Sequence, residues 1–232
     1  MNLLDLIFPK FCVNCRRFGD FLCPDCFSRL SFDTKNICLV CGNPSYDGFT
    51  HPGCRGKYRI DGSFTGVVFN PVSKKLIYQF KYKPYLSGLA LFLTDLLYES
   101  LIQNEEFNKI IRSPLLFVPI SLSSKRFRKR GYNQAEILAK GLSKKFGFSV
   151  LNCLERTRET RSQVGLSKED RKDNVKGAFD INIKNQKLNL KNRNILLVDD
   201  VLTTGSTFSE AANVLKRAGA GKVWAIAFAR EQ

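Results

Sequence analysis

The chain has 232 residues, of which 44% are hydrophobic and 25% are charged, as expected for a folded protein with one full domain and a small module. The longest apolar stretch, residues 86–101, is interrupted by Asp95 and Glu99, which excludes a transmembrane helix there. The formal net charge of +16 favours polyanionic partners such as nucleic acid, phosphorylated metabolites or an acidic membrane surface, with solubility alone as the alternative.

The first residues, MNLLDLIFPKF, lack the basic segment of a secretory signal and include Asp5. We therefore expect a cytoplasmic protein, with a peripheral position at the inner membrane as a variant of that prediction.

Seven of the eight cysteines fall between residues 12 and 54, and six of them form three pairs separated by two residues. The only histidine, His51, stands three positions before Cys54 and completes a fourth pair. Such pairs are typical of tetrahedral zinc sites, because a tight turn directs both side chains at one ion. The predicted metal ligands are Cys12, Cys15, Cys23, Cys26, Cys38, Cys41, His51 and Cys54.

These eight donors suffice for two structural Zn²⁺ ions, and one ion remains the alternative if His51 is an ordinary loop residue. Two consecutive four-ligand sites are the preferred grouping, and an interleaved arrangement stays open. A disulfide framework is the competing interpretation, which a reducing cytosol disfavours. We interpret the remote Cys153 as a buried thiol.

A module this short cannot bury a large core, so bound metal would supply much of its stability. Since every ligand position is filled, the module is expected to be structural or a binding surface. We predict a zinc-binding domain over residues 1–58 and a larger domain over residues 59–232.

The larger domain alternates predicted strands with predicted helices. In chain order we expect a strand at 64–69, a turn at 70–73, a basic and aromatic segment at 76–85, a helix at 86–102, a strand at 114–120, a basic loop, a helix opened by Asn133 with Glu136 in a capping box, a strand at 194–200, a helix at 206–219 and a strand at 222–229. This alternation predicts an α/β domain with a mainly parallel sheet.

Residues 197–207, LVDDVLTTGST, form the most informative motif of the chain. The two carboxylates of Asp199 and Asp200 follow a buried strand, where α/β folds bind their ligands. A loop of hydroxyl residues around Gly205 then leads into a helix, whose N-terminus favours phosphate. Carboxylates can accept hydrogen bonds from the two neighbouring hydroxyls of a ribose, and the adjacent loop can bind a phosphate group. Together they predict a sugar 5-phosphate as the ligand. An ordinary strand–loop–helix turn is the structural alternative.

The motif resembles the phosphoribosyl pyrophosphate (PRPP) binding motif of type I phosphoribosyltransferases. Other segments resemble the ComF (ComFC) competence proteins, which join an N-terminal zinc module to a phosphoribosyltransferase-like domain. They are the cysteine pairs, FKY at 80–82, VPISLSSKRFRKRGYNQAEILAKGLS at 118–143 and RTRETRSQVGLSKEDRKDNVKGAF at 156–179. His51 departs from the cysteine usual in that family.

This resemblance implies roles for several groups of residues. The implied PRPP-binding residues are Asp199, Asp200, Thr203, Thr204, Gly205, Ser206, Thr207, Lys125 and Arg126, with Mg²⁺ bound alongside PRPP, and Val118–Ser124 matching the pyrophosphate loop. Residues 156–171 match a mobile loop that closes over PRPP, or else form an ordinary exposed connection. No catalytic residue is assigned.

Cations interleaved with aromatic residues after position 124 are typical of single-stranded nucleic-acid binding, with a solvated face as the alternative. The DNA-binding residues predicted are Arg128, Lys129, Arg130, Tyr132 and Arg161.

Three functions follow from these patterns. The preferred one is a ComF-type competence protein that binds PRPP and handles single-stranded DNA in the cytoplasm during natural transformation, with the DNA-uptake helicase or translocation machinery as a partner. The second is an active phosphoribosyltransferase that couples PRPP to an unidentified base or amine. The third is a regulator that only senses PRPP.

Overall fold

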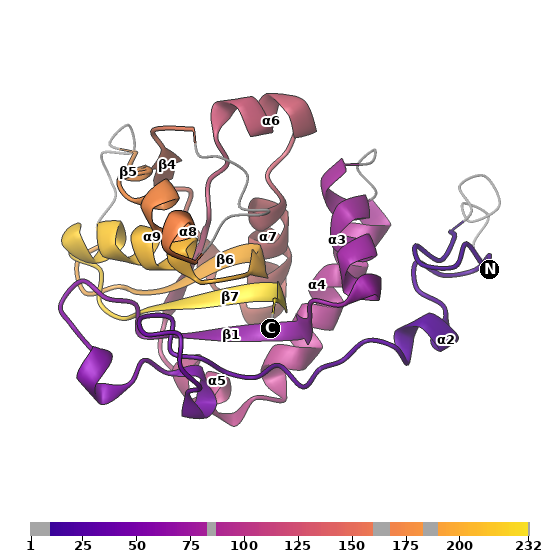
Figure 1. The fold of residues 1–232 in the computed structure, drawn as a ribbon, viewed down its shortest axis with the longest axis horizontal. Helices are drawn as coiled ribbons and strands as arrows, with labels where there is room; N and C mark the ends of the chain where they lie inside the picture. The colour runs from indigo at the N-terminus through magenta and orange to yellow at the C-terminus, as the bar shows by residue number, and fades with distance from the viewer. Residues whose placement is uncertain (1–9, 83–86, 160–167, 183–189, 232) are drawn as a thin grey trace.

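The computed structural model describes residues 10–82, 87–159, 168–182 and 190–231 of the chain (Figure 1). The cysteine-rich N-terminal segment has little regular structure. Its only helical turns are α2 (Pro24–Phe27), η1 (Tyr46–Gly48) and η2 (Pro52–Cys54) within the part described. This agrees with a segment whose shape depends on metal ligation more than on a core.

The larger domain is built on a five-stranded sheet in the order β1-β7-β6-β2-β3, and every neighbouring pair is parallel. Its strands are β1 (Gly62–Val68), β2 (Leu115–Pro119), β3 (Ser149–Val150), β6 (Asn194–Leu202) and β7 (Val223–Arg230). A separate antiparallel pair consists of β4 (Leu154–Arg156) and β5 (Phe179–Ile181). The predicted α/β class with a parallel sheet is confirmed.

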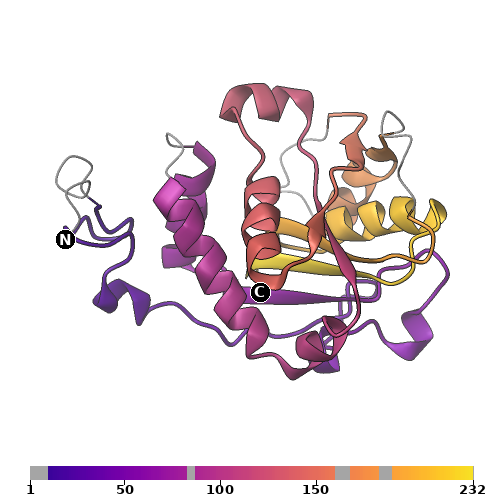
Figure 2. The ribbon, with the colours of Figure 1, turned by 180° about the vertical axis from the view of Figure 1, so that it is seen from behind.

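Helices cover both faces of the sheet, as the opposite views in Figures 1 and 2 show. They are α3 (Pro71–Tyr82), α4 (Ser87–Ile102), α5 (Glu105–Ile110), α6 (Ser124–Arg130), α7 (Gln134–Phe146), α8 (Lys168–Val175) and α9 (Ser206–Arg217). Side chains of α3, α4 and α7 share one buried cluster with one face of the sheet, and α9 shares a second cluster with the other face.

Both clusters include residues from the cysteine-rich segment. Cys12 and Leu22 belong to the cluster with α3 and α4, while Leu39 belongs to the cluster with α9. Phe21 also lies against α4, since a Cβ built at Gly88 would be 2.7 Å from its ring. The zinc module is therefore packed against the sheet domain at two places, and the domain boundary at residue 58 stays a prediction.

Two segments differ from the sequence-based expectation. Residues 70–73 begin helix α3 instead of forming a turn, because Asn70 Oδ1 accepts from the amides of Val72 and Ser73 and caps a helix with Pro71 in its first position. The basic loop contains the short helix α6, which ends at Gly131 with a φ of 79°. Asn133 caps α7 as predicted, with its side chain accepting from the Ala135 amide.

None of the helices in the described ranges is long and apolar enough to cross a membrane.

Candidate functional site

The acidic pair lies inside strand β6, which continues two residues beyond it to Leu202. The last β2 partner of this strand is Pro119, opposite Val198. Asp199 is thus the first β6 residue past the end of β2, although β6 is still paired with β7 there. The loop predicted after Asp200 is accordingly shorter than expected, and the two carboxylates stand at a step in the carboxyl edge of the sheet.

Asp200 forms an ion pair with a residue from α3. Lys81 Nζ lies 2.8 Å from Asp200 Oδ2, and the two side chains are 20% and 7% exposed. A buried carboxylate needs such a partner, because its charge is otherwise costly to desolvate. Sequence patterns did not assign this role to Lys81, since the contact joins segments that are distant along the chain.

Asp199 is half-buried and has a different environment. Its Oδ1 accepts from the Asp200 amide at 2.8 Å. Burial and the neighbouring negative charge of Asp200 raise its pKa to about 7, against the opposing charge of Lys81. The anionic form of Asp199 is thereby disfavoured, and a ligand that donates hydrogen bonds or brings a cation would favour its ionised form.

Beyond the acids, Thr203–Gly205 connects β6 to helix α9, whose twelve residues begin at Ser206. Gly205 stands at the N-cap with a φ of 77°, a conformation that suits glycine. The hydroxyls of Thr204 and Ser206 lie 2.8 Å apart, and Thr203 and Thr207 are half-buried. Backbone amides and hydroxyls therefore surround the positive end of the α9 dipole, which suits a phosphate group.

The second cysteine-rich unit supports this loop directly. A Cβ built at Gly205 would lie 2.8 Å from Leu39 Cδ2, and Leu39 sits between Cys38 and Cys41. Glycine is required here for close packing as well as for its backbone conformation. Sequence reasoning explained Gly205 only by access of a ligand to the backbone and did not predict the role of Leu39.

Arg156 interacts electrostatically with Asp199. Arg156 ends β4 and lies over the Phe179 ring at 4.9 Å, and burial followed by the charge of Arg126 lowers its pKa to about 10. Arg156 Nε and Ser121 Oγ are buried without a hydrogen-bond partner among the described residues. Unpaired buried donors are rare, so these groups are suited to an anionic ligand.

Helix α6 carries the cation run. Lys125, Arg128 and Lys129 are exposed, and Lys125 Nζ is 3.9 Å from a carboxylate oxygen of Glu159. Arg130 instead contacts α3, where it donates to Tyr82 Oη at 3.1 Å.

Tyr132 also faces α3, because its hydroxyl donates to the Phe80 carbonyl and its ring packs on Phe80. The predicted residues thus divide between an exposed set and a set that attaches α6 to α3. Arg161 and the rest of residues 160–167, the middle of the predicted mobile loop, lie outside the described residues.

The predicted metal ligands gather into two groups in consecutive order. Cys12, Cys15, Cys23 and Cys26 form the first group, and Cys38, Cys41, His51 and Cys54 form the second. Within each group all ligand atoms lie within 4.8 Å of one another, close to the separation of about 3.8 Å between sulfurs in a tetrahedral site with Zn–S bonds of 2.3 Å. Both groups therefore fit a Zn²⁺ ion, and the interleaved grouping is not adopted.

His51 is oriented for ligation. Its Nε2 lies 2.9 Å from the Pro44 carbonyl, which only accepts, so the proton is on Nε2. Its Nδ1 is then free of a proton and lies 3.4 Å from Cys41 Sγ. A histidine ligand whose other nitrogen donates to a carbonyl is the usual arrangement at zinc.

Two protein families match separate parts of the chain. The double zinc ribbon domain family matches residues 3–55, and the phosphoribosyl transferase domain family matches residues 128–232.

Relatives match over most of the chain. Competence protein F of Haemophilus influenzae is 32% identical over 88% of this chain and 83% of its own length. DNA utilization protein YhgH of Escherichia coli is 31% identical over 95% of this chain and 98% of its own length. Competence protein ComFC of Bacillus subtilis is 28% identical over 85% of this chain and 79% of its own length. With its double zinc ribbon, its parallel sheet and its acidic pair before a phosphate-type loop, the chain belongs to the ComF family of competence and DNA utilization proteins.

Proposed function

We propose that the protein binds PRPP at the junction of β6 and α9 and handles single-stranded DNA during natural transformation. The observation that carries the PRPP part is the placement of Asp199 next to the loop 203–207, at the step where β2 ends. The DNA part is supported by the names of the relatives, some of which are called competence proteins and others DNA utilization proteins.

In this proposal the 5-phosphate of PRPP binds the amides and hydroxyls of Thr203–Thr207 at the N-terminus of α9. Asp199 accepts hydrogen bonds from the ribose hydroxyls, because the ammonium group of Lys81 forms its ion pair with Asp200. Asp200 keeps Lys81 as its partner and holds α3 at the site. This arrangement divides the predicted acid pair into a ligand-contacting member and a supporting member.

The pyrophosphate end of PRPP would meet the loop Val118–Ser124 and the cations Lys125 and Arg126. Mg²⁺ enters bound to PRPP and neutralises part of the pyrophosphate charge. Ser121 Oγ and Arg156 Nε are unpaired donors in the described structure and are available to this anion.

The test is calorimetric titration with PRPP and Mg²⁺, with ribose 5-phosphate and pyrophosphate as partial ligands. Asp199→Asn should weaken PRPP and ribose 5-phosphate but leave pyrophosphate nearly unchanged, because pyrophosphate has no sugar hydroxyls for this carboxylate to bind. Asp180→Asn, which removes an exposed acid of β5, is the matched control. Equal affinities of both variants for PRPP would overturn the assignment.

For DNA, the proposed contacts are the exposed cations Arg128 and Lys129 and the neighbouring Arg130, with Tyr132 as the aromatic member. Arg161, which lies outside the described residues, is proposed from the sequence alone. Binding through phosphates releases counterions, so affinity for oligo(dT) should fall steeply with salt. The double change Arg128→Gln, Lys129→Gln should reduce that slope, whereas Lys144→Gln, an exposed cation at the end of α7, should not. A salt-independent affinity would contradict the DNA part.

Turnover is a second candidate function, favoured by the unpaired donors Ser121 Oγ and Arg156 Nε and by the charge of Arg126 close to Arg156. In that reaction a bond forms between the acceptor nitrogen and C1 of the ribose, the C1–O bond to pyrophosphate breaks, and the acceptor releases a proton. Pyrophosphate release on mixing PRPP with bases, amines and oligonucleotides tests it. If PRPP binds but no acceptor causes pyrophosphate release, turnover is rejected, and the protein handles DNA in response to PRPP without catalysis.

We place this function in the cytoplasm, beside the helicase or translocation machinery that would deliver the DNA, with the two zinc ribbons in a structural role. Zinc analysis of the purified protein, which should give two equivalents, tests the last point.

A further inference from the structure

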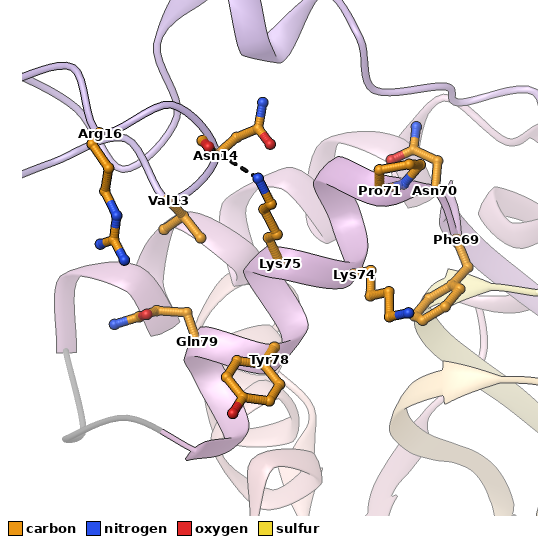
Figure 3. Close-up of a pocket in the computed structure, with 10 residues that line it drawn as sticks. All are labelled: Val13, Asn14, Arg16, Phe69, Asn70, Pro71, Lys74, Lys75, Tyr78 and Gln79. Atoms are coloured by element: carbon orange, nitrogen blue, oxygen red, sulfur yellow. Dashed lines mark hydrogen bonds between the residues drawn. The ribbon is translucent and has the colours of Figure 1, made fainter. Parts of the chain in front are cut away.

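A cleft of about 800 Å³ lies between the first zinc ribbon and helix α3, away from the acidic pair (Figure 3). The ribbon contributes residues between 13 and 16, and the two residues after β1 together with helix α3 contribute residues between 69 and 79. The lining residues that the argument uses are Asn14, Arg16, Asn70, Lys74, Lys75 and Tyr78.

Hydrogen bonds fix the two walls of this cleft relative to each other. Lys75 Nζ donates to the Asn14 carbonyl at 3.1 Å, a contact visible in Figure 3. Asn70 Nδ2 donates to the Arg29 carbonyl at 2.9 Å, and the Val68 amide donates to the Ser31 carbonyl at 2.8 Å. The cleft is therefore a built feature and not a gap between loosely connected parts.

The charge of the cleft is entirely positive. Arg16, Lys74 and Lys75 line it, and no lining residue is acidic. Helix α3 contains no acidic residue at all. The nearby Arg17 is paired with Asp25 on the ribbon, so that acid is already neutralised. Three cations in a concave wall create a field that attracts polyanions.

Arg16 occupies a backbone conformation that an arginine rarely adopts. It follows Cys15 with a φ of 67°, and the equivalent position of the second ribbon, after Cys41, is Gly42 with a φ of 81°. Both amides bond to the first cysteine of their pair, Arg16 to Cys12 and Gly42 to Cys38. The two ribbons thus share one turn, in which the left-handed position is glycine in the second ribbon and Arg16 in the first. Glycine adopts this conformation without strain, whereas arginine does not. Arg16 therefore places a cation at a position where glycine would be less strained, and strained residues cluster at functional sites.

Aromatic rings continue the cleft along α3 towards α6. Tyr78 and Tyr82 are 57% and 48% exposed, and their ring centroids are 5.0 Å apart. The guanidinium of Arg130 lies 5.0 Å from the centre of the Tyr82 ring. Exposed rings beside cations provide stacking surfaces for unpaired bases, independent of sequence.

We propose that this cleft, which we define as the ribbon–α3 cleft, binds single-stranded nucleic acid. Arg16, Lys74 and Lys75 contact its phosphates, and a base stacks on Tyr78. The strand then passes Tyr82 to the exposed cations of α6. This inference rests on the proposed function only in taking single-stranded DNA as a ligand. It adds a second DNA-binding site, in the ribbon–α3 cleft, that is separate from the one on α6. An acidic polypeptide would satisfy the cations but would leave the tyrosine rings without a stacking partner.

The test measures binding of fluorescein-labelled oligo(dT) of about 16 nucleotides to the zinc-loaded full chain. Arg16→Gly removes the cation and relieves the strained turn, so folding is retained. Lys74→Gln changes an exposed residue, and Lys144→Gln is the matched control for the removal of one charge. The double variant Arg16→Gly, Lys74→Gln should lower affinity and reduce the slope of log affinity against log salt by roughly 0.7 for each phosphate that the variant no longer neutralises.

Tyr78 gives a readout that charge does not affect. Tyr78→Leu should weaken oligo(dT) binding roughly fivefold or more, because the aromatic face is removed, while Tyr78→Phe should bind like the unchanged protein. PRPP binding should be unaffected in both variants. Equal binding of Tyr78→Leu and Tyr78→Phe would overturn the stacking assignment.

The outcomes separate this inference from the proposed function. Wild-type affinity of the double cleft variant, with weakened binding of Arg128→Gln, Lys129→Gln, would overturn the cleft and leave DNA binding on α6. Competition by polyglutamate as strong as that by unlabelled oligo(dT) would overturn it in favour of an acidic protein partner. Absence of any oligo(dT) binding by the unchanged protein would overturn both.

Discussion

Lys81 Nζ lies 2.8 Å from Asp200 Oδ2 and joins helix α3 to the acidic pair of β6. Removal of one partner leaves a charge that is mostly buried, so Lys81→Met should lower the free energy of unfolding by about 3 kcal/mol. The double variant Lys81→Met, Asp200→Asn should recover part of that loss, since neither charge remains. Urea denaturation of the four proteins measures the coupling, and strictly additive changes would show that the pair does not contribute.

The second prediction concerns the close contact at Gly205, for which another glycine of the same backbone conformation, Gly147, provides a control. Gly205 and Gly147 have φ values of 77° and 76°, but a Cβ at Gly147 would meet nothing within 4 Å. Gly147→Ala should therefore cost only the strain of the left-handed conformation, about 1–2 kcal/mol.

Gly205→Ala should cost about 1–3 kcal/mol more, because its methyl group overlaps Leu39. Adding Leu39→Ala to Gly205→Ala should remove most of the excess. Thermal unfolding of the three variants checks this, and equal losses in Gly205→Ala and Gly147→Ala would contradict a close contact with the ribbon.

The parts of this structure that could be predicted from sequence are those encoded locally. Buried parallel strands appear as short apolar runs, so β2, β6 and β7 lie within one or two residues of their predicted bounds. The cysteine pairs and the acidic pair with its loop are also contiguous motifs. These features required no knowledge of what packs against them.

The parts that sequence did not predict depend on distant contacts or on ambiguous signals. Lys81 and Leu39 take their roles from contacts across the fold, with Asp200 and Gly205. Asn70–Pro71 is equally suitable for a turn and for a helix start, and the helix prevails because α3 buries Leu76, Ile77 and Phe80 against the sheet.

Asp199 predicts a pH dependence of stability. Its pKa rises from an ordinary value of 3.8 to about 7 in the folded protein, through burial and the charge of Asp200. A carboxyl with a raised pKa stabilises the fold most when it is protonated, and this contribution is lost as the pH rises from about 4 through about 7. The side chain of the Asp199→Asn variant stays neutral at every pH. The thermal midpoint of this variant should therefore rise relative to that of the wild type as the pH increases from 5 to 8. A constant difference across this range would contradict the raised pKa.

The last prediction concerns the two zinc ribbons, which contact different parts of the sheet domain. Leu39 of the second ribbon packs on Gly205, whereas the first ribbon contacts α3 and α4. His51→Ala should remove one of two zinc equivalents and weaken PRPP binding, because the loop at Gly205 loses its support. His51→Cys should restore both properties, since a thiolate is an equivalent ligand.

Cys15→Ser is the control from the first ribbon, and it should also remove one zinc equivalent while PRPP binding is retained. Metal analysis combined with calorimetry distinguishes the two ribbons. Equal weakening of PRPP binding in His51→Ala and Cys15→Ser would show that zinc loss acts through general unfolding and that the contact between Leu39 and Gly205 carries no special coupling.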